Sequence, residues 1–191
     1  FWVCPGTSSW NTLFPRIDNS NANIRTLVRQ GAEHGASGML NTDWGDHGHY
    51  QPTGQCWYGY VFGLEQAWSG GTTPDEAFDP RFGRLFFGVG GERVVGAMRD
   101  LGRLNTLPGM AHGGNASRSV YILLEDPLVG DSIAALSTDA LEEIVDTCAR
   151  AERTLRGAIA TSRAPLSLEE MVYSARLVAY AAKKVRASKK M

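Results

Sequence analysis

The stretch from Gly38 to Tyr50 constrains this chain most, because a short apolar run there ends abruptly in polar residues. The run begins at a glycine, and its length is typical of a buried β-strand. Two carboxylates, a tryptophan and two histidines follow it, which is typical of a loop at the carboxyl end of a strand. In parallel α/β sheets and barrels, that edge carries the chemistry. We therefore expect the functional groups to gather there.

Two successive strand–helix units surround this stretch. Phe1–Cys4 predicts a strand, and an apolar stripe at helical spacing predicts a helix from Asn19 or Asn21 to about His34. The strand Gly38–Thr42 follows, and then a second helix runs from about Trp57 to Ser69, where two glycines end it. This repeat is the pattern of a parallel sheet or a (β/α)8 barrel.

The remainder of the chain predicts mainly helices. Proline and acidic residues at Thr73–Glu76 indicate one helix start, and Asp79-Pro80 indicates another. A long apolar stripe predicts a helix from Thr138 to about Thr161, and the capping box Ser167–Glu170 opens the last helix. The short connection between these two predicts an antiparallel hairpin. The run Ser119–Leu124 is compatible with either strand or helix. We divide the chain into residues 1–70 and 71–191.

Composition narrows the choice of partners and compartment. Hydrophobic residues make up 43% of the 191 residues and charged residues 20%, which indicates a globular protein. The net charge of −1 gives no reason to expect a nucleic-acid partner, and no apolar run approaches the ~20 residues of a membrane span. Three cysteines without a CxxC motif favour free thiols and hence, weakly, a cytoplasmic location. The first residue is not methionine, so we expect a fragment or processed chain.

The residue types after the second strand suit a carbohydrate ligand. A carboxylate accepts hydrogen bonds from sugar hydroxyls, and an indole face packs against the C–H face of a pyranose. Asp43, Trp44 and Asp46 are therefore candidate substrate-binding residues, and Trp10 is a candidate second wall. The alternative interpretation is that Trp44 belongs to the core and that the aspartates cap a turn.

The same loop also carries metal-ligand types. Asp43, Asp46, His47 and His49 are suitable ligands for zinc or manganese. However, the glycines between them leave the backbone loose, and no distant cysteine, histidine or aspartate cluster completes a ligand set. We therefore predict no metal and no other cofactor, and we expect the histidines to anchor the loop.

Three segments of the chain, Cys4–Asn11, Asn19–Arg25 and Thr42–His49, resemble the C-terminal end of the catalytic barrel of glycoside hydrolase family 20, the β-N-acetylhexosaminidases. The resemblance covers roughly Phe1 to Trp68. Trp44-Gly45-Asp46 is similar to the Trp-x-Glu element of that family, with aspartate in place of glutamate. The resemblance implies that Trp44 walls a pocket for the terminal sugar and that Asp46 binds its outer hydroxyls.

The resemblance has two departures. The family's catalytic Asp-Glu pair lies on an earlier strand and has no match in this chain, so we assign no catalytic residue. The family's tyrosine on the penultimate strand, which holds the substrate acetamide, has no match in residues 1–10 either. In the family mechanism, the acetamide itself is the nucleophile.

The resemblance and the βα pattern together predict an α/β fold, the C-terminal portion of a (β/α)8 TIM barrel (residues 1–70) followed by an all-helical extension (residues 71–191). They predict part of a glycoside hydrolase that acts on terminal (N-acetyl)hexosaminides and has a carbohydrate as its partner. Two alternatives stay open. One is a non-catalytic carbohydrate-binding or scaffold protein, and the other is a metal-dependent hydrolase that uses Asp43, Asp46, His47 and His49.

Overall fold

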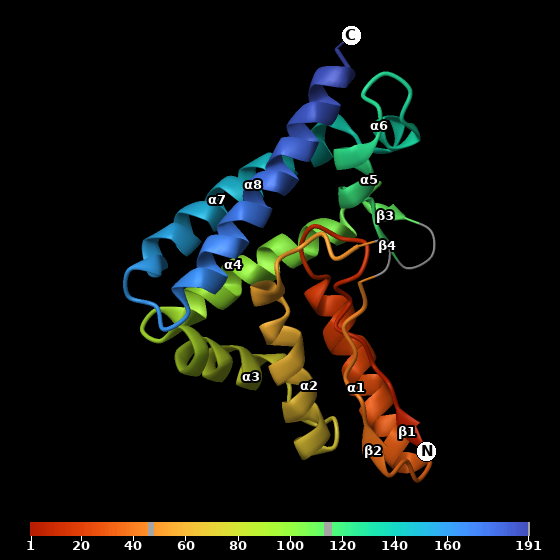
Figure 1. The fold of residues 1–191 in the computed structure, drawn as a ribbon, viewed down its shortest axis with the longest axis vertical. Helices are drawn as coiled ribbons and strands as arrows, with labels where there is room; N and C mark the ends of the chain where they lie inside the picture. Colours follow the sequence, from red (N-terminus) through yellow and green to blue (C-terminus); the bar gives the residue numbers. More distant parts are fainter. Residues whose placement is uncertain (46–47, 113–115, 191) are drawn as a thin grey trace.

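The computed structural model describes residues 1–45, 48–112 and 116–190, and most of these are helical. Figure 1 shows long helices arranged around a central helix, with the two ends of the chain far apart. The elements in chain order are β1 (Trp2–Val3), α1 (Ile17–Glu33), β2 (Gly38–Met39), η1 (Thr53–Gln55), α2 (Trp57–Ser69), α3 (Asp75–Phe82), η2 (Gly83–Phe87), α4 (Gly91–Arg103), η3 (Leu104–Thr106), β3 (Ala111–His112), β4 (Ala116–Ser117), α5 (Arg118–Leu124), α6 (Asp131–Ala135), α7 (Thr138–Ile159) and α8 (Pro165–Ser188).

The N-terminal strands pair in parallel, as the strand–helix repeat predicts. Trp2 lies opposite Gly38 and Val3 opposite Met39, and α1 connects the two strands (Figure 1). The predicted bounds of α2 are confirmed. Gly70 ends that helix in the left-handed conformation, with φ 65°, which a residue without a β-carbon adopts at little cost.

The predicted barrel portion is wrong. Among the described residues, the strands form two separate two-stranded sheets, and the rest of the ordered structure is helical. A barrel of this class closes only with eight parallel strands. The first strand is also not buried, since 61% of Trp2 is exposed. A strand–helix repeat in the sequence shows only which segments form strands and helices. The same repeat is therefore compatible with a barrel and with a single pair of parallel strands packed beside helices.

The helical remainder follows the prediction more closely. α7 and α8 pack side by side as a hairpin, and their facing residues join one continuous core with α4 (Figure 1). Some local predictions need correction. α8 begins at Pro165, ahead of the predicted capping box Ser167–Glu170. Pro80 lies inside α3 rather than starting a new helix, and the chain then widens into the π-helical turn η2. Residues 111–112 and 116–117 add a short antiparallel pair to the part that we expected to be all-helical.

Hydrogen bonds join the two parts of the chain that the sequence divides near Gly70. The backbone N–H of Gly54 donates to a carboxylate oxygen of Glu170 in α8 at 2.8 Å. The side-chain amide of Gln55 donates to Ser174 and, at 3.3 Å, to the Glu170 carbonyl. A β-carbon at position 54 would lie 2.0 Å from the Glu170 oxygen and 3.1 Å from Cα of Ser167, so a larger residue would displace the Glu170 carboxylate. The start of α2 is thereby fixed against the C-terminal helix.

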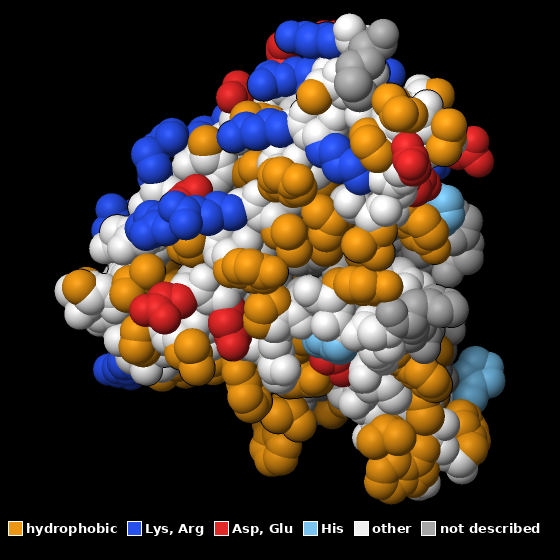
Figure 2. Space-filling model, turned by 45° about the horizontal axis from the view of Figure 1, so that its top comes forward, with side chains coloured by type: hydrophobic (Ala, Val, Ile, Leu, Met, Phe, Trp, Pro, Cys, Tyr) orange, Lys and Arg blue, Asp and Glu red, His pale blue; other side chains and the backbone are white. Residues whose placement is uncertain are grey.

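The surface has two contrasting ends. Figure 2 shows basic side chains over α7 and α8, and apolar side chains gathered at the opposite end. Large exposed apolar side chains of β1 and α2 include Trp2, Leu64 and Trp68. In the described part of the chain, every helix is too short or too polar to cross a lipid bilayer.

Candidate functional site

The parallel pairing of β1 and β2 brings two loops together at the carboxyl ends of the strands. The pairing continues beyond the strands, because Gly6 bridges Thr42. The Thr42 N–H donates to the Pro5 carbonyl at 2.8 Å, and the Thr7 N–H donates to the Thr42 carbonyl at 2.9 Å. The residues after Thr42 therefore lie against the loop after β1, which is the edge at which we expected polar groups to gather.

Asp43 is the central carboxylate of this edge. Its side chain is only 9% exposed. One oxygen accepts a hydrogen bond from the Thr7 hydroxyl at 3.0 Å, and the other accepts one from the Tyr60 phenol at 2.5 Å. Burial acts to raise the pKa of Asp43, but these hydrogen bonds, one from Cys56, and the interaction with His49 outweigh it and hold the pKa below its ordinary value. Asp43 is therefore ionised at neutral pH.

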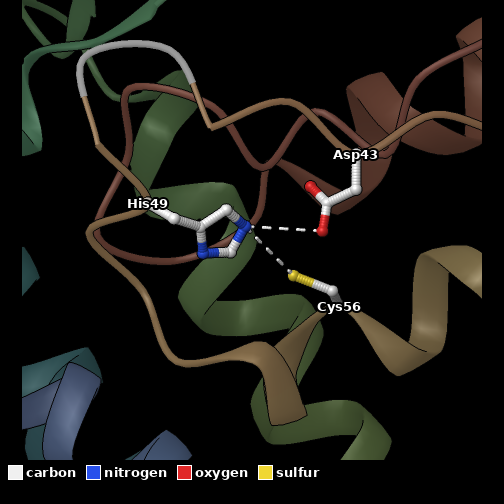
Figure 3. Close-up of side chains that lie close together, drawn as sticks. All are labelled: Asp43, His49 and Cys56. Carbon is white, nitrogen blue, oxygen red and sulfur yellow. Dashed lines mark hydrogen bonds and ion pairs between the residues drawn. The ribbon is translucent and has the colours of Figure 1, made fainter.

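His49 and Cys56 complete a group that we call the Asp43 cluster. Figure 3 shows the three side chains pointing toward one another, from the loop after β2, from its return and from the start of α2. Nε2 of His49 lies 3.4 Å from an Asp43 carboxylate oxygen and 3.9 Å from the Cys56 sulfur. Nδ1 of the same ring lies 2.7 Å from the Gln51 carbonyl oxygen. One ring nitrogen thus faces both other members of the cluster.

The cluster is not a thiolate nucleophile with its general base. Burial and the nearby charge of Asp43 raise the pKa of the Cys56 thiol to about 12, so the thiol stays protonated at neutral pH. A relay from carboxylate through imidazole to nucleophile also needs the two partners on opposite ring nitrogens. Here both partners face Nε2. Acyl transfer by Cys56 therefore does not fit this geometry.

The two candidate tryptophans border the Gly6–Thr42 bridge. Trp44 is 55% exposed, and its indole N–H donates to the Thr42 hydroxyl at 2.8 Å. Trp10 is half-buried, and a β-carbon on Gly6 would lie 2.8 Å from its ring. The guanidinium of Arg16 lies 5.1 Å from the centre of the Trp10 ring. Of the two indoles, Trp44 offers the larger surface to a ligand.

The loop after β1 has a constrained backbone. Ser8 and Asn11 have φ angles of 54° and 49°, in the left-handed region that side chains with a β-carbon rarely adopt. The Ser8 hydroxyl donates to the Asn19 side chain of α1 at 2.6 Å, which helps to hold this conformation. Such conformations cost roughly 1–3 kcal/mol and concentrate at functional sites.

The structure brings together some of the predicted site residues. Asp43 and His49 are in contact, and Trp44 and Trp10 lie at the same edge. The predicted ligand Asp46 and the metal alternative's His47 lie outside the described residues.

Two residues, Cys56 and Tyr60, contact Asp43 but were not identified from the sequence. Cys56 was treated as one of three free thiols and Tyr60 as part of the predicted helix. Their spacing of four residues at the start of a predicted helix puts both on one face, and that was the available signal.

No protein-family model, curated protein or solved structure matches this chain. The likeness to glycoside hydrolase family 20 therefore rests on the residues quoted above.

Proposed function

We propose that this chain contributes a carbohydrate-binding surface to a glycoside hydrolase for terminal (N-acetyl)hexosaminides, with Trp44 as the platform on which the sugar stacks. The observation that carries the proposal is an indole more than half exposed and fixed by its N–H bond to Thr42, next to the ionised Asp43. An exposed, immobilised ring loses little conformational freedom when a sugar packs on it, which favours binding.

Asp43 has a positioning role in this proposal. Both of its carboxylate oxygens already accept hydrogen bonds, from Thr7 and Tyr60. These bonds tie the loop after β2 to the loop after β1 and to α2, and they hold the backbone that carries Trp44. The role of binding sugar hydroxyls stays with Asp46, and Trp10 stays the second wall. The resemblance implies that the catalytic acid is not among the residues of this chain.

The test is nuclear magnetic resonance of the indole N–H groups of the purified chain during titration with N-acetylglucosamine and, separately, glucose. We expect the Trp44 resonance to shift saturably, and more with the acetylated sugar. Trp44→Ala removes binding, whereas Trp68→Ala keeps it, because Trp68 is an equally large but 93% exposed indole at the far end of α2. A Trp44 resonance that does not move at tens of millimolar of either sugar would sink the proposal.

A further inference from the structure

The Asp43 cluster gathers three ligand types that transition metals prefer. One oxygen, one imidazole nitrogen and one sulfur lie within 4.8 Å of one another. They come from three points of the chain: the exit of β2, the return of its loop and the start of α2. In Figure 3 the carboxylate of Asp43, the imidazole of His49 and the sulfur of Cys56 point toward a common centre. Carboxylate and imidazole suit several metals, but a thiolate selects the softer ions such as zinc.

The two separations measured from His49 Nε2 are close to those around one zinc ion. With metal–ligand bonds of about 2.0–2.2 Å to nitrogen and oxygen and about 2.3 Å to sulfur, a tetrahedral zinc site spaces nitrogen from oxygen by roughly 3.4 Å and nitrogen from sulfur by roughly 3.6 Å. The corresponding distances from His49 Nε2 are 3.4 Å to Asp43 and 3.9 Å to Cys56. A movement of the Cys56 sulfur toward His49 by a few tenths of an ångström would bring the second distance to the value of a zinc site.

The hydrogen bond from His49 Nδ1 to the Gln51 carbonyl leaves the other ring nitrogen, Nε2, facing Asp43. The Gln51 carbonyl can only accept, so Nδ1 carries the hydrogen of the ring, and in the neutral ring Nε2 presents a lone pair. That lone pair faces an ionised carboxylate at 3.4 Å. A metal ion placed between these two atoms would therefore be bound by both of them.

Each of the three ligand side chains is hydrogen-bonded to a second residue, as the ligands of metal sites usually are. A metal-bound histidine normally donates its other N–H to a carbonyl, as His49 does, and ligating carboxylates are themselves hydrogen-bonded, as Asp43 is by Thr7 and Tyr60. The Cys56 sulfur also lies 3.6 Å from the Ser9 hydroxyl and 3.9 Å from the Gln51 amide. These contacts fix each ligand before an ion arrives.

We propose that Asp43, His49 and Cys56 bind one zinc ion, with water in the fourth position. The Cys56 thiol gives its proton to solvent as the sulfur binds the ion. Water reaches the ion past His49, whose side chain is 30% exposed, whereas Asp43 and Cys56 close the inner side. This ligand set replaces the loop-only set considered in the sequence, because it adds a sulfur from α2. The zinc site goes beyond the proposed function and shares Asp43 with it, but the two are read separately, the metal at Cys56 and the sugar at Trp44.

The test uses Co²⁺ as a spectroscopic probe, because a cobalt–thiolate bond gives a charge-transfer absorption in the near ultraviolet. All proteins carry Cys4→Ser, which removes the exposed thiol. We expect one Co²⁺ per chain, the thiolate band, and displacement of Co²⁺ by Zn²⁺. Cys148→Ser is the matched control, since Cys148 is a buried thiol in α7 outside the cluster, and it should keep the band.

Two variants decide the outcome. Cys56→Ser should lose the thiolate band. His49→Ala, which changes a partly exposed ring and so keeps the fold, should weaken Co²⁺ binding by more than about tenfold, since loss of even an outer-shell partner weakens binding by that much. Circular dichroism of both variants checks folding. Absence of stoichiometric Co²⁺ binding, or unchanged Co²⁺ affinity in His49→Ala, overturns the proposal.

Discussion

Two groups of carboxylates lie near the start of α2, one bonded to Tyr58 and the other to Tyr60, and they differ in the positive group that they contact. In the Arg99 cluster, one guanidinium of α4 bonds to Asp18 of α1, Tyr58 of α2, and Asp75 and Asp79 of α3, at 2.8–3.0 Å. In the Asp43 cluster, the ion pair recorded among the described residues is with an imidazole, beside a thiol.

The difference separates a structural centre from the proposed binding centre. Arg99 is 7% exposed, and burial acts to lower its pKa, but the hydrogen bonds and charges of Asp79, Tyr58 and Asp75 raise it above the ordinary value. The Arg99 cluster is therefore complete without any ligand and fastens four helices. The Asp43 cluster instead has a carboxylate, an imidazole and a thiol facing one point, each held by its own hydrogen bonds.

The largest expected effect tests the completeness of the Arg99 cluster. Arg99→Met leaves two partly buried carboxylates, Asp75 and Asp79, without their shared cation, so we expect a loss of up to about 3–5 kcal/mol in the free energy of unfolding. Arg103→Met is the control, because Arg103 is 59% exposed at the end of the same helix and also contacts Asp18. It should cost less than about 1 kcal/mol. Urea denaturation measures both, and equal losses would show that Arg99 is not a structural centre.

A matched pair of tyrosines compares the two clusters directly. The Tyr58 phenol accepts from Arg99 and Asn21 and donates to Asp79, whereas the Tyr60 phenol donates to Asp43. We expect Tyr58→Phe to cost about 1–3 kcal/mol and Tyr60→Phe no more than about 1.5 kcal/mol, because fewer buried partners lose their hydrogen bond. Urea denaturation of the two variants gives the order. The reverse order would mean that the Asp43 cluster holds the fold more strongly.

A smaller effect is expected in acid. Burial acts to raise the pKa of Asp75, but hydrogen bonds from Asn21 and Arg25 and the charge of Arg99 lower it below its ordinary value. A carboxyl with a lowered pKa in the folded state stabilises the fold above its unfolded pKa, about 3.9, and loses that contribution as pH falls through the lower, folded pKa. Stability should therefore decline below about pH 4.

Urea midpoints between pH 5 and pH 2.5 measure this decline. Asp75→Asn should make the decline shallower, while Glu76→Gln, at an exposed neighbouring position, should leave it as in the unchanged protein. If both variants decline alike, the Arg99 cluster does not set the acid sensitivity.

The smallest effect concerns the rim of the Asp43 cluster. Trp44→Ala removes an indole that is more than half exposed and one hydrogen bond, to Thr42, so the free energy of unfolding should change by less than about 1 kcal/mol. Urea denaturation measures the change. A larger loss would favour the interpretation of Trp44 as a core residue and would weaken its assignment as a sugar platform.

Local patterns predicted much of the secondary structure. The apolar face of α2 and the glycines after it gave both of its bounds, and apolar stripes with a short connection gave the α7–α8 hairpin. The number of strands was not available from such patterns, because strand pairing depends on partners distant in the sequence. Trp2 and Leu40 have strand-like neighbours but stay more than half exposed.

The position of Asp43 at the strand edge followed from the sequence, but the other residues that contact it did not. Parallel strands place Asp43 beside the loop after β1 whatever the remaining fold, so the edge itself followed from the βα repeat. Cys56 and Tyr60 join the cluster because α2 starts beside that edge, and this depends on the bonds of Gly54 and Gln55 to α8. The partner residues of those bonds, Glu170 and Ser174, lie more than a hundred positions away in the chain.

The hydrogen bonds between Gly54, Gln55 and α8 also determine how the protein comes apart. They join residues 1–70 to residues 71–191, as does the Arg99–Asp18 ion pair. Unfolding of either part would therefore expose buried groups of the other. Calorimetry should therefore record a single cooperative transition. A protease that cuts the exposed turn at Ser69 or Gly70 leaves the two pieces associated, and a chain shortened before α8 loses the support that aims Cys56 at Asp43. The C-terminal helix therefore supports the cluster from a distant part of the chain, and its removal would take away the hydrogen bonds that position the residues before Cys56.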